Sequence, residues 1–228
     1  NSFDFNWRLE PDEEFNAPEA VMVYSADGFG NMSRNFHKLY KNRLVRGKFK
    51  DAPRPVLINN WEATYFDFNE DKVVSIAETA QKAGIEMLVL DDGWFGKRND
   101  DTTSLGDWFV DKNKLPNGIE GLAKRVTDIG MKFGLWFEPV MISPDSDLYR
   151  AHPDWCLHVK NRESGLGRHQ LILDLSRADV CDYIVEFMTR ILKSAPISYV
   201  KWDMNRNMSC VGSAELDAAR QPEVYHRY

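Results

Sequence analysis

The chain has 228 residues, of which 43% are apolar and 28% are charged, a composition typical of a globular protein with one sizeable core. Its formal net charge of −6 is opposite in sign to what a nucleic-acid-binding surface requires, and no apolar run is long enough to span a bilayer. The three cysteines form no C-x-x-C pair and no signal-peptide pattern opens the chain, so we expect a reducing, cytoplasmic location without a disulfide framework or a zinc site.

Residues 1–50 differ in pattern from the rest of the chain. They contain one apolar run, Ala20–Tyr24, and a short stretch of apolar residues at helical spacing. The basic segment Lys38–Lys50 is followed by the turn-forming residues Asp51–Pro55. We therefore expect residues 1–50 to close a preceding domain and to link it to a second domain over residues 51–228.

Strand and helix patterns alternate after this linker. Four continuous apolar runs are predicted strands, at Val56–Ile58, Met87–Leu90, Phe133–Phe137 and Ile197–Val200. Three stretches with apolar residues at helical spacing lie between them, at Val73–Ala83, Ile119–Ile129 and Val180–Ile191. Continuously apolar strands that alternate with helices predict a parallel sheet with helices on its outer face.

The ends of the predicted helices have their own signals. Gly84 and Gly130 close the first two helices, because glycine adopts the left-handed conformation that ends a helix. Ser176 and Asp179 have the spacing of a capping box and predict the start of the third helix.

A long insertion separates the third predicted strand from the fourth. Within it, Trp155–Val159 and Gln170–Leu173 flank the glycines of Gly165–Gly167, a pattern that predicts a β-hairpin. We expect this hairpin to lie over the mouth of the fold, with Arg168 close to it.

Polar or aromatic residues follow every predicted strand directly. They are Asn59–Glu62, Asp91–Trp94, Glu138 and Lys201–Asp203. In a (β/α)₈ barrel the carboxyl ends of all strands converge on one active site, whereas an open doubly wound sheet spreads them along an edge. The pattern favours the barrel over the open sheet.

Asp203 is the first candidate for chemistry, because it ends an apolar strand and would be held rigidly. Lys201, two residues earlier, points to the same side of the strand, and a cation beside a carboxylate favours the ionised form that a nucleophile needs. Asn205 follows and has a side chain that can donate to a substrate hydroxyl. A Lys–Asp pair that only ties the sheet to a helix is an equally good interpretation of the spacing alone.

Asp91 and Asp92 form a second cluster, whose adjacent negative charges need compensation. Sugar hydroxyls, a divalent metal or a turn would each supply it. Hydroxyl binding is favoured over a metal because no His or third carboxylate has ligand spacing nearby. Trp61 and Trp136, at the ends of the first and third strands, are core residues if taken singly, but beside these carboxylates they suit a sugar-binding pocket.

Five segments together resemble the bacterial α-galactosidases of glycoside hydrolase family 36. They are Trp61–Glu62, Leu90–Phe95, Gly134–Pro139, Tyr199–Arg206 and Tyr225–Tyr228. The resemblance implies an α/β fold in which residues 51–228 form the first four strands of a (β/α)₈ TIM barrel. It also implies that residues 1–50 are the end of an N-terminal β-sandwich domain and its connection to the barrel.

The resemblance implies a retaining α-galactosidase that releases terminal, non-reducing α-D-galactose from galactosides such as melibiose and raffinose. Asp203 matches the family's nucleophile, and the family uses no cofactor and no metal. The implied substrate-binding residues are Trp61, Asp91, Asp92, Trp136, Arg168, Lys201 and Asn205.

These binding residues have separate implied roles. Asp91 and Asp92 match the pair that binds the axial O4 and the O6 hydroxyl of galactose. Trp61 and Trp136 match aromatic residues of the pocket wall. The other three match residues that hold substrate hydroxyls and orient the nucleophile.

One catalytic residue of the family has no counterpart in this sequence. A retaining glycosidase needs a second carboxyl group to protonate the leaving oxygen, and in the family this Asp lies on a later strand, past Tyr228. We therefore expect the isolated chain to lack full catalysis. An open half-barrel also leaves two strand edges unpaired, so we expect self-association into a homo-oligomer.

Other functions stay open at this point. The same scaffold would serve an α-N-acetylgalactosaminidase, a galactosyl transferase or a fragment that binds galactosides without cleaving them. Gly28–Ser33 imitates a dinucleotide-binding glycine motif, but its third glycine position is Ser and no acidic residue ends a second strand, so we interpret it as a loop.

Overall fold

The computed structural model describes residues 5–228. Their contacts divide them into two compact units, one made of residues 5–8 with Val56–Tyr228 and the other of Leu9–Pro55. The larger unit contains every strand and all the predicted site residues.

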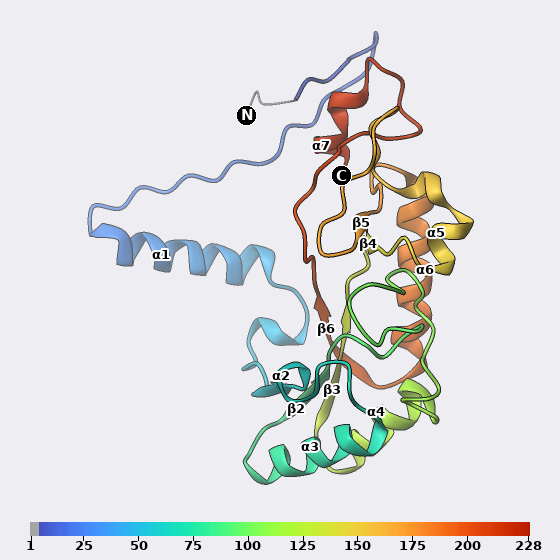
Figure 1. The fold of residues 1–228 in the computed structure, drawn as a ribbon. Helices are drawn as coiled ribbons and strands as arrows, with labels where there is room; N and C mark the ends of the chain where they lie inside the picture. The colour runs from blue at the N-terminus through green and yellow to red at the C-terminus, as the bar shows by residue number, and fades with distance from the viewer. Residues whose placement is uncertain (1–4) are drawn as a thin grey trace. The chain divides into compact units, whose positions relative to one another are not determined.

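A four-stranded parallel sheet is the centre of the larger unit (Figure 1). Its strands are β1 (Leu57–Asn59), β2 (Met87–Leu90), β3 (Lys132–Phe137) and β6 (Ile197–Trp202). Each one overlaps a strand predicted from an apolar run. β2 and β3 are buried almost throughout, because helices and loops cover both of their faces.

The order of the strands decides between the barrel and the open sheet. Within the sheet they run β1-β2-β3-β6, which is their order along the chain, and every neighbouring pair is parallel. Right-handed crossovers between strands laid down in one direction place all connecting helices on the same face, whereas a doubly wound sheet reverses direction at a switch point. The larger unit therefore has no switch point among its four strands and matches half of a (β/α)₈ barrel, as predicted.

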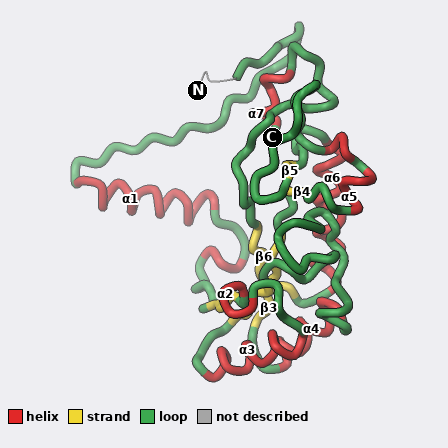
Figure 2. The backbone as a smooth tube through the Cα atoms, in the orientation of Figure 1, coloured by secondary structure: helices red, strands yellow, loops and turns green. Residues whose placement is uncertain are grey.

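Three helices connect the strands, and they flank the sheet in Figures 1 and 2. They are α3 (Glu70–Lys82), α4 (Gly118–Asp128) and α6 (Ala178–Ser194). The Asn69 side chain accepts the backbone N–H of Lys72 at 2.9 Å and so caps α3. Gly84 and Gly130 follow α3 and α4 with φ of +84° and +86°, which confirms both predicted stops.

The predicted capping box at the start of α6 is wrong. Arg177 is the N-cap residue of this helix, and its side chain makes no capping bond. The Ser176 hydroxyl instead donates to Asp174 Oδ1 at 2.5 Å, and the Asp179 carboxylate accepts from Arg177. The Asp179 carboxylate therefore binds the buried Arg177 side chain instead of capping the helix.

The insertion between β3 and β6 forms a pairing that the sequence indicated only in part. Cys156 bridges antiparallel to Leu173, as the predicted hairpin requires. The second arm of the hairpin also contains β5 (Leu171–Ile172). This strand pairs antiparallel with β4 (Met141–Ile142), a two-residue strand that the apolar pattern did not predict. The hairpin is therefore anchored to the segment that directly follows β3.

The smaller unit is helical. It contains α1 (Gly28–Leu39), a π-helical turn at Tyr40–Leu44 and a 3₁₀ turn at Lys48–Lys50. The glycine motif Gly28–Ser33, interpreted as a loop, is the first part of α1. Residues 5–50 contain no strand, and their assignment to the end of a β-sandwich stays a prediction.

The remaining elements are short. They are α2 (Trp61–Thr64), α5 (Asp147–Ala151), α7 (Val224–Arg227) and 3₁₀ turns at Pro153–Trp155 and Gln221–Glu223. Among residues 5–228, no helix has the length and apolar character needed to cross a membrane.

Candidate functional site

Asp203 lies directly after β6, where three groups donate to its carboxylate. Trp136 Nε1 and Asn205 Nδ2 donate to Oδ2 at 3.1 and 2.9 Å, and the Met204 N–H donates to Oδ1 at 3.0 Å. Partial burial alone would raise the pKa of Asp203, but these donors and the charge of Lys201 outweigh it and lower the pKa. Asp203 is therefore held as a carboxylate.

Lys201 forms its ion pair with Asp91, not with Asp203. Its Nζ lies 2.7 Å from Asp91 Oδ2, although the two residues are 110 positions apart in the chain. Asn59 Nδ2 donates to the same oxygen at 2.5 Å, and the Asp92 N–H donates to Oδ1 at 2.9 Å. The expected effect of Lys201 on Asp203 thus acts through space, while its direct contact stabilises Asp91.

Asp92 is compensated by a residue that the sequence did not single out. Arg98 donates through Nε to Oδ1 at 3.1 Å and through Nη2 to Oδ2 at 2.9 Å, and both side chains are almost fully buried. Burial raises the pKa of Asp92 even though Arg98 opposes the shift. Arg98 lies in the irregular loop after β2, where no periodic pattern marks a residue as buried.

Trp136 reaches the cluster through its indole N–H rather than through an open ring face. The side chain is 1% exposed and its ring stacks on Phe95 at 6.2 Å, so it is a core residue that also orients Asp203. Trp61 is half-buried in α2, and its backbone N–H donates to Asn59 Oδ1 at 2.8 Å. Trp61 is the tryptophan of this pair that keeps exposed surface.

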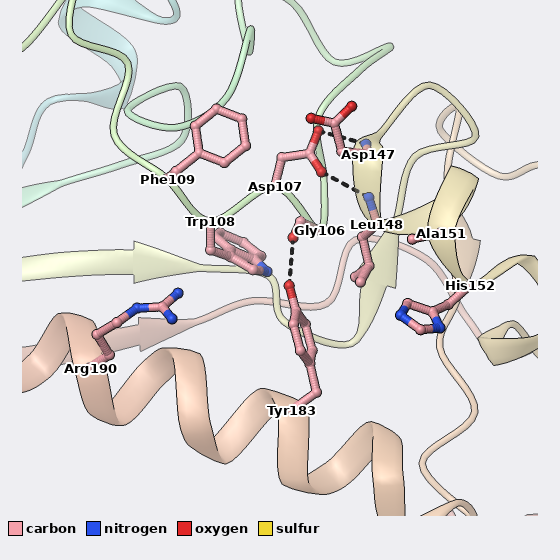
Figure 3. A pocket seen from close by; sticks show the side chains of 10 residues that line it. All are labelled: Gly106, Asp107, Trp108, Phe109, Asp147, Leu148, Ala151, His152, Tyr183 and Arg190. Atoms are coloured by element: carbon pink, nitrogen blue, oxygen red, sulfur yellow. Dashed lines mark hydrogen bonds between the residues drawn. The ribbon is translucent and has the colours of Figure 1, made fainter.

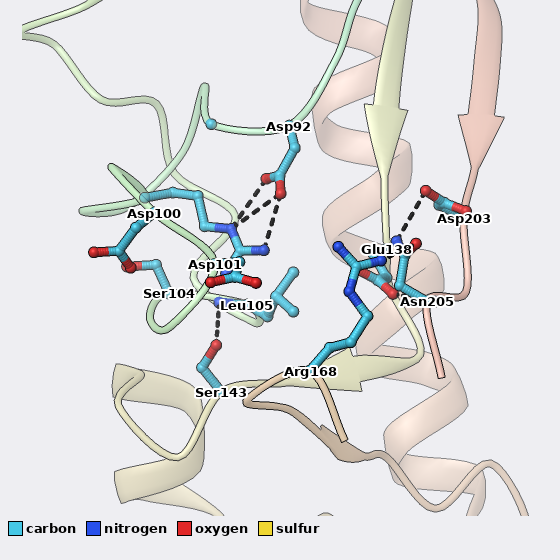
Figure 4. Close-up of polar contacts among 12 residues, drawn as sticks. Asp92, Asp100, Asp101, Ser104, Leu105, Glu138, Ser143, Arg168, Asp203 and Asn205 are labelled. Atoms are coloured by element: carbon cyan, nitrogen blue, oxygen red, sulfur yellow. Dashed lines mark hydrogen bonds and ion pairs between the residues drawn. The ribbon is translucent and has the colours of Figure 1, made fainter. Parts of the chain in front are cut away.

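Arg168, Asn205 and Glu138 extend the network around Asp203 (Figure 4). Arg168, at the exposed tip of the insertion, donates to Asn205 Oδ1 at 2.6 Å, and Glu138 Oε1 accepts the Asn205 N–H at 2.5 Å. Arg168 has φ of +49°, an unfavourable conformation for a residue with a side chain. The contact to Asn205 therefore joins the insertion to the end of β6.

The structure thus brings the predicted residues to one edge of the sheet. Asp91 and Asp92 follow β2, Glu138 follows β3 and Asp203 follows β6, and these three strands are neighbours. Among residues 5–228, no group of three or more His, Cys, Asp or Glu side chains has the arrangement of a metal site. The charges of the cluster are balanced by Lys and Arg instead.

A separate cleft of about 290 Å³ lies between α5, α6 and the loop around Trp108 (Figure 3). Of its two acids, Asp107 accepts the backbone N–H groups of Asp147 and Leu148, and Asp147 pairs with Arg150. The Tyr183 hydroxyl donates to the Gly106 carbonyl. The cleft shares no residue with the cluster around Asp203, and the contacts of Asp107 and Tyr183 are structural.

The family profile and similar curated proteins agree on one family. The profile of the Melibiase family matches residues 14–228. The α-galactosidase AgaA of Geobacillus stearothermophilus is 62% identical over 228 residues, which are 100% of this chain and 31% of that enzyme. The α-galactosidase Mel36A of Lactobacillus acidophilus is 55% identical, with the same two coverages of 100% and 31%.

Solved structures agree with the sequence matches. The crystal structure of AgaA, a GH36 α-galactosidase, superimposes with a TM-score of 0.98 and covers 100% of this chain and 32% of its own. A variant of that enzyme in complex with raffinose gives the same TM-score of 0.98 at 62% identity, with coverages of 100% and 32%. The chain spans about a third of the length of the curated relatives it matches.

Proposed function

Because the chain belongs to the Melibiase family, GH36, we propose that the intact protein hydrolyses terminal α-galactosides with retention of configuration, and that Asp203 is its nucleophile. The α-galactosidases among the relatives support the reaction class. The observation that carries the assignment of Asp203 is its hydrogen-bonded, ionised carboxylate at the carboxyl end of a barrel strand.

The hydrogen bonds of Asp203 indicate which of its oxygens attacks. Oδ2 accepts from both Trp136 and Asn205, which uses both of its in-plane lone pairs. Oδ1 accepts only the Met204 N–H among the described residues and keeps one lone pair free. In the proposed reaction Oδ1 forms a bond to the anomeric carbon of galactose while the bond to the leaving oxygen breaks.

Asp91 and Asp92 are proposed to bind galactose hydroxyl groups. Each has an Oδ1 atom that accepts a single hydrogen bond within the described protein, from the Asp92 N–H and from Arg98 respectively. Each carboxylate therefore has capacity to accept one hydroxyl. Lys201 lies against Asp91 and has further protons to donate, and the exposed Arg168 and the half-buried Trp61 are proposed to border the sugar.

The second carboxyl group of the reaction is not assigned to a residue of this chain. The family resemblance puts the acid/base Asp on a later strand, and retaining enzymes hold their two carboxyl groups about 5 to 5.5 Å apart. We propose galacto-oligosaccharides of the raffinose and melibiose type as substrates, since a relative binds raffinose in the crystal.

The test uses the intact protein and p-nitrophenyl α-galactoside. Asp203→Ala is expected to lower kcat on the order of 10⁴-fold or more, as loss of a catalytic nucleophile does in other hydrolases. Azide, a small anion, is expected to restore turnover and to yield β-galactosyl azide, because it attacks from the side that the carboxylate occupied.

The matched control is Asp128→Ala, which removes an exposed carboxylate at the end of α4; within residues 5–228 its ion pair is with Lys124. It is expected to leave kcat unchanged. Full activity of Asp203→Ala, or a wild-type protein that does not cleave the substrate, would rule out the proposal.

A further inference from the structure

Glu138 is a buried acid in the cluster to which the proposed reaction gives no role. The residue directly follows β3 and is only 1% exposed, and its Oε1 atom accepts the backbone N–H of Asn205. The second oxygen, Oε2, is fully buried and has no hydrogen-bond partner among the described residues. A buried acid with one unsatisfied oxygen costs stability, so its presence here calls for a functional explanation.

Asn205 connects Glu138 to the nucleophile. The backbone N–H of Asn205 is held by Glu138, while its side-chain amide donates to Asp203 Oδ2 at 2.9 Å and accepts from Arg168 at 2.6 Å. The bond to Glu138 crosses from β3 to the segment after β6, so it fixes this segment against the neighbouring strand. Release of the Asn205 backbone would let the amide and the carboxylate of Asp203 turn together.

The charge state of Glu138 follows from its surroundings. The pKa of Glu138 is raised to about 7, mainly by burial; the bonds from Asn205 oppose this shift, and the negative charges of Asp203 and Asp92 add to it. These two carboxylates act on Glu138 from the ends of β6 and β2. Below about pH 7 Glu138 is a neutral acid, and above it becomes a third anion in the cluster.

We propose that Glu138 is a positioning residue, which holds Asn205 and through it Asp203 in the reacting geometry. The proposal rests on the function proposed for Asp203. It also implies a cost of ionisation: the anion accepts the Asn205 N–H more strongly, but it is repelled by Asp203 and Asp92, and this repulsion displaces the nucleophile.

The test compares two substitutions in the intact protein. Glu138→Gln keeps the shape and the oxygen that accepts the Asn205 N–H but cannot ionise, so it is expected to retain kcat at pH 5.5 within about threefold. Glu138→Ala is expected to lower kcat about 10- to 100-fold with little change in KM, because misplacement of a catalytic group by about an ångström has an effect of this size.

The dependence of kcat on pH separates a positioning role from a purely structural one, because replacing a purely structural acid would not shift it. In the wild type, kcat is expected to decline as the pH rises through about 7, where Glu138 loses its proton. In Glu138→Gln the share of this decline that Glu138 causes is expected to vanish, which moves the alkaline limb to higher pH, while the limb set by the acid/base carboxyl remains. An unchanged alkaline limb in the Gln variant, or an Ala variant with full kcat, would overturn the proposal.

Asp174→Ala is the matched control for burial. Asp174 is 0% exposed and also has one buried oxygen without a partner among the described residues, but it bonds Ser176 and not the Asp203 network. It is expected to lower stability without the change in kcat and pH profile. If Asp203→Ala abolishes turnover while both Glu138 variants behave as the wild type, only the role of Glu138 fails.

Discussion

At the scale of single residues, each acid of the cluster has its own partner and therefore its own charge state. Asp203 has a lowered pKa because donors surround it, whereas Asp92 and Glu138 have raised pKa values because they are buried. Environments that push the pKa values of neighbouring acids apart are typical of active sites. Residue type alone would have made these three acids equivalent.

The buried pair of Asp92 and Arg98 gives a prediction at this scale. Arg98→Met is expected to lower the free energy of unfolding by about 3 to 5 kcal/mol near pH 7, because it leaves a buried carboxylate without its cation. The loss is expected to be smaller near pH 4, since Asp92 already has a raised pKa and takes up a proton more readily without Arg98. Denaturant titrations at the two pH values measure both effects.

Arg150→Met is the control for this prediction. Arg150 pairs with Asp145 and Asp147, but all three side chains are more than half exposed. Exposed pairs contribute little to stability, so only a small change is expected. Equal losses for the two arginine variants would contradict the account of the buried pair.

At the scale of the elements, close packing between neighbouring strands limits the size of the side chains in β3. Gly134 lies between Val89 of β2 and Tyr199 of β6, and the register with β6 shifts beside it. A Cβ atom at this position would lie 3.0 Å from Val89 Cγ2 and 3.1 Å from Tyr199 Cδ1. A side chain at this position would therefore force Val89 and Tyr199 to shift.

Gly134→Ala is expected to destabilise the chain by about 1 to 3 kcal/mol, the usual effect of overpacking a core. The measurement is the urea midpoint of unfolding. The same substitution at Gly30 serves as control, because Gly30 is in α1 and the nearest atom to its Cβ is the flexible end of Arg34 at 3.4 Å. Gly30→Ala is expected to be neutral or stabilising, since alanine favours helix by up to about 1 kcal/mol. A neutral Gly134→Ala would refute the packing argument.

At the scale of the whole molecule, the sheet has two open edges. Within the described residues β1 pairs only with β2 and β6 only with β3. Tyr199 and Trp202 of β6 are 40% and 53% exposed, so apolar surface accompanies the unpaired backbone groups. Such an edge favours pairing with another chain.

We expect this chain, studied by itself, to self-associate with increasing concentration. Trp202→Lys is expected to shift association to higher concentration, because a charge on an edge strand opposes pairing. Val185→Lys, at an exposed apolar position in α6 rather than on a strand, is expected to leave it unchanged. Sedimentation velocity over a range of concentrations measures the state, and a monomer at every concentration would contradict the expectation.

The order and type of the main elements could be predicted from the amino-acid sequence. Apolar runs and helical spacing are local properties, so β1, β2, β3, β6 and the three helices between them fall where the pattern predicts. The carboxyl ends of those strands also identified Asp91, Asp92 and Asp203 as candidates, because a parallel sheet gathers its strand ends at one edge.

The partners of these acids were decided only by the tertiary structure. Lys201 shares a strand face with Asp203 but bonds Asp91 across the sheet, and Arg98 turns back from a loop onto Asp92. Two-residue strands such as β4 and β5 escape prediction for the same reason, since their pairing depends on contacts between distant segments. Local sequence encodes periodicity, whereas hydrogen bonds and ion pairs depend on which segments the fold brings together.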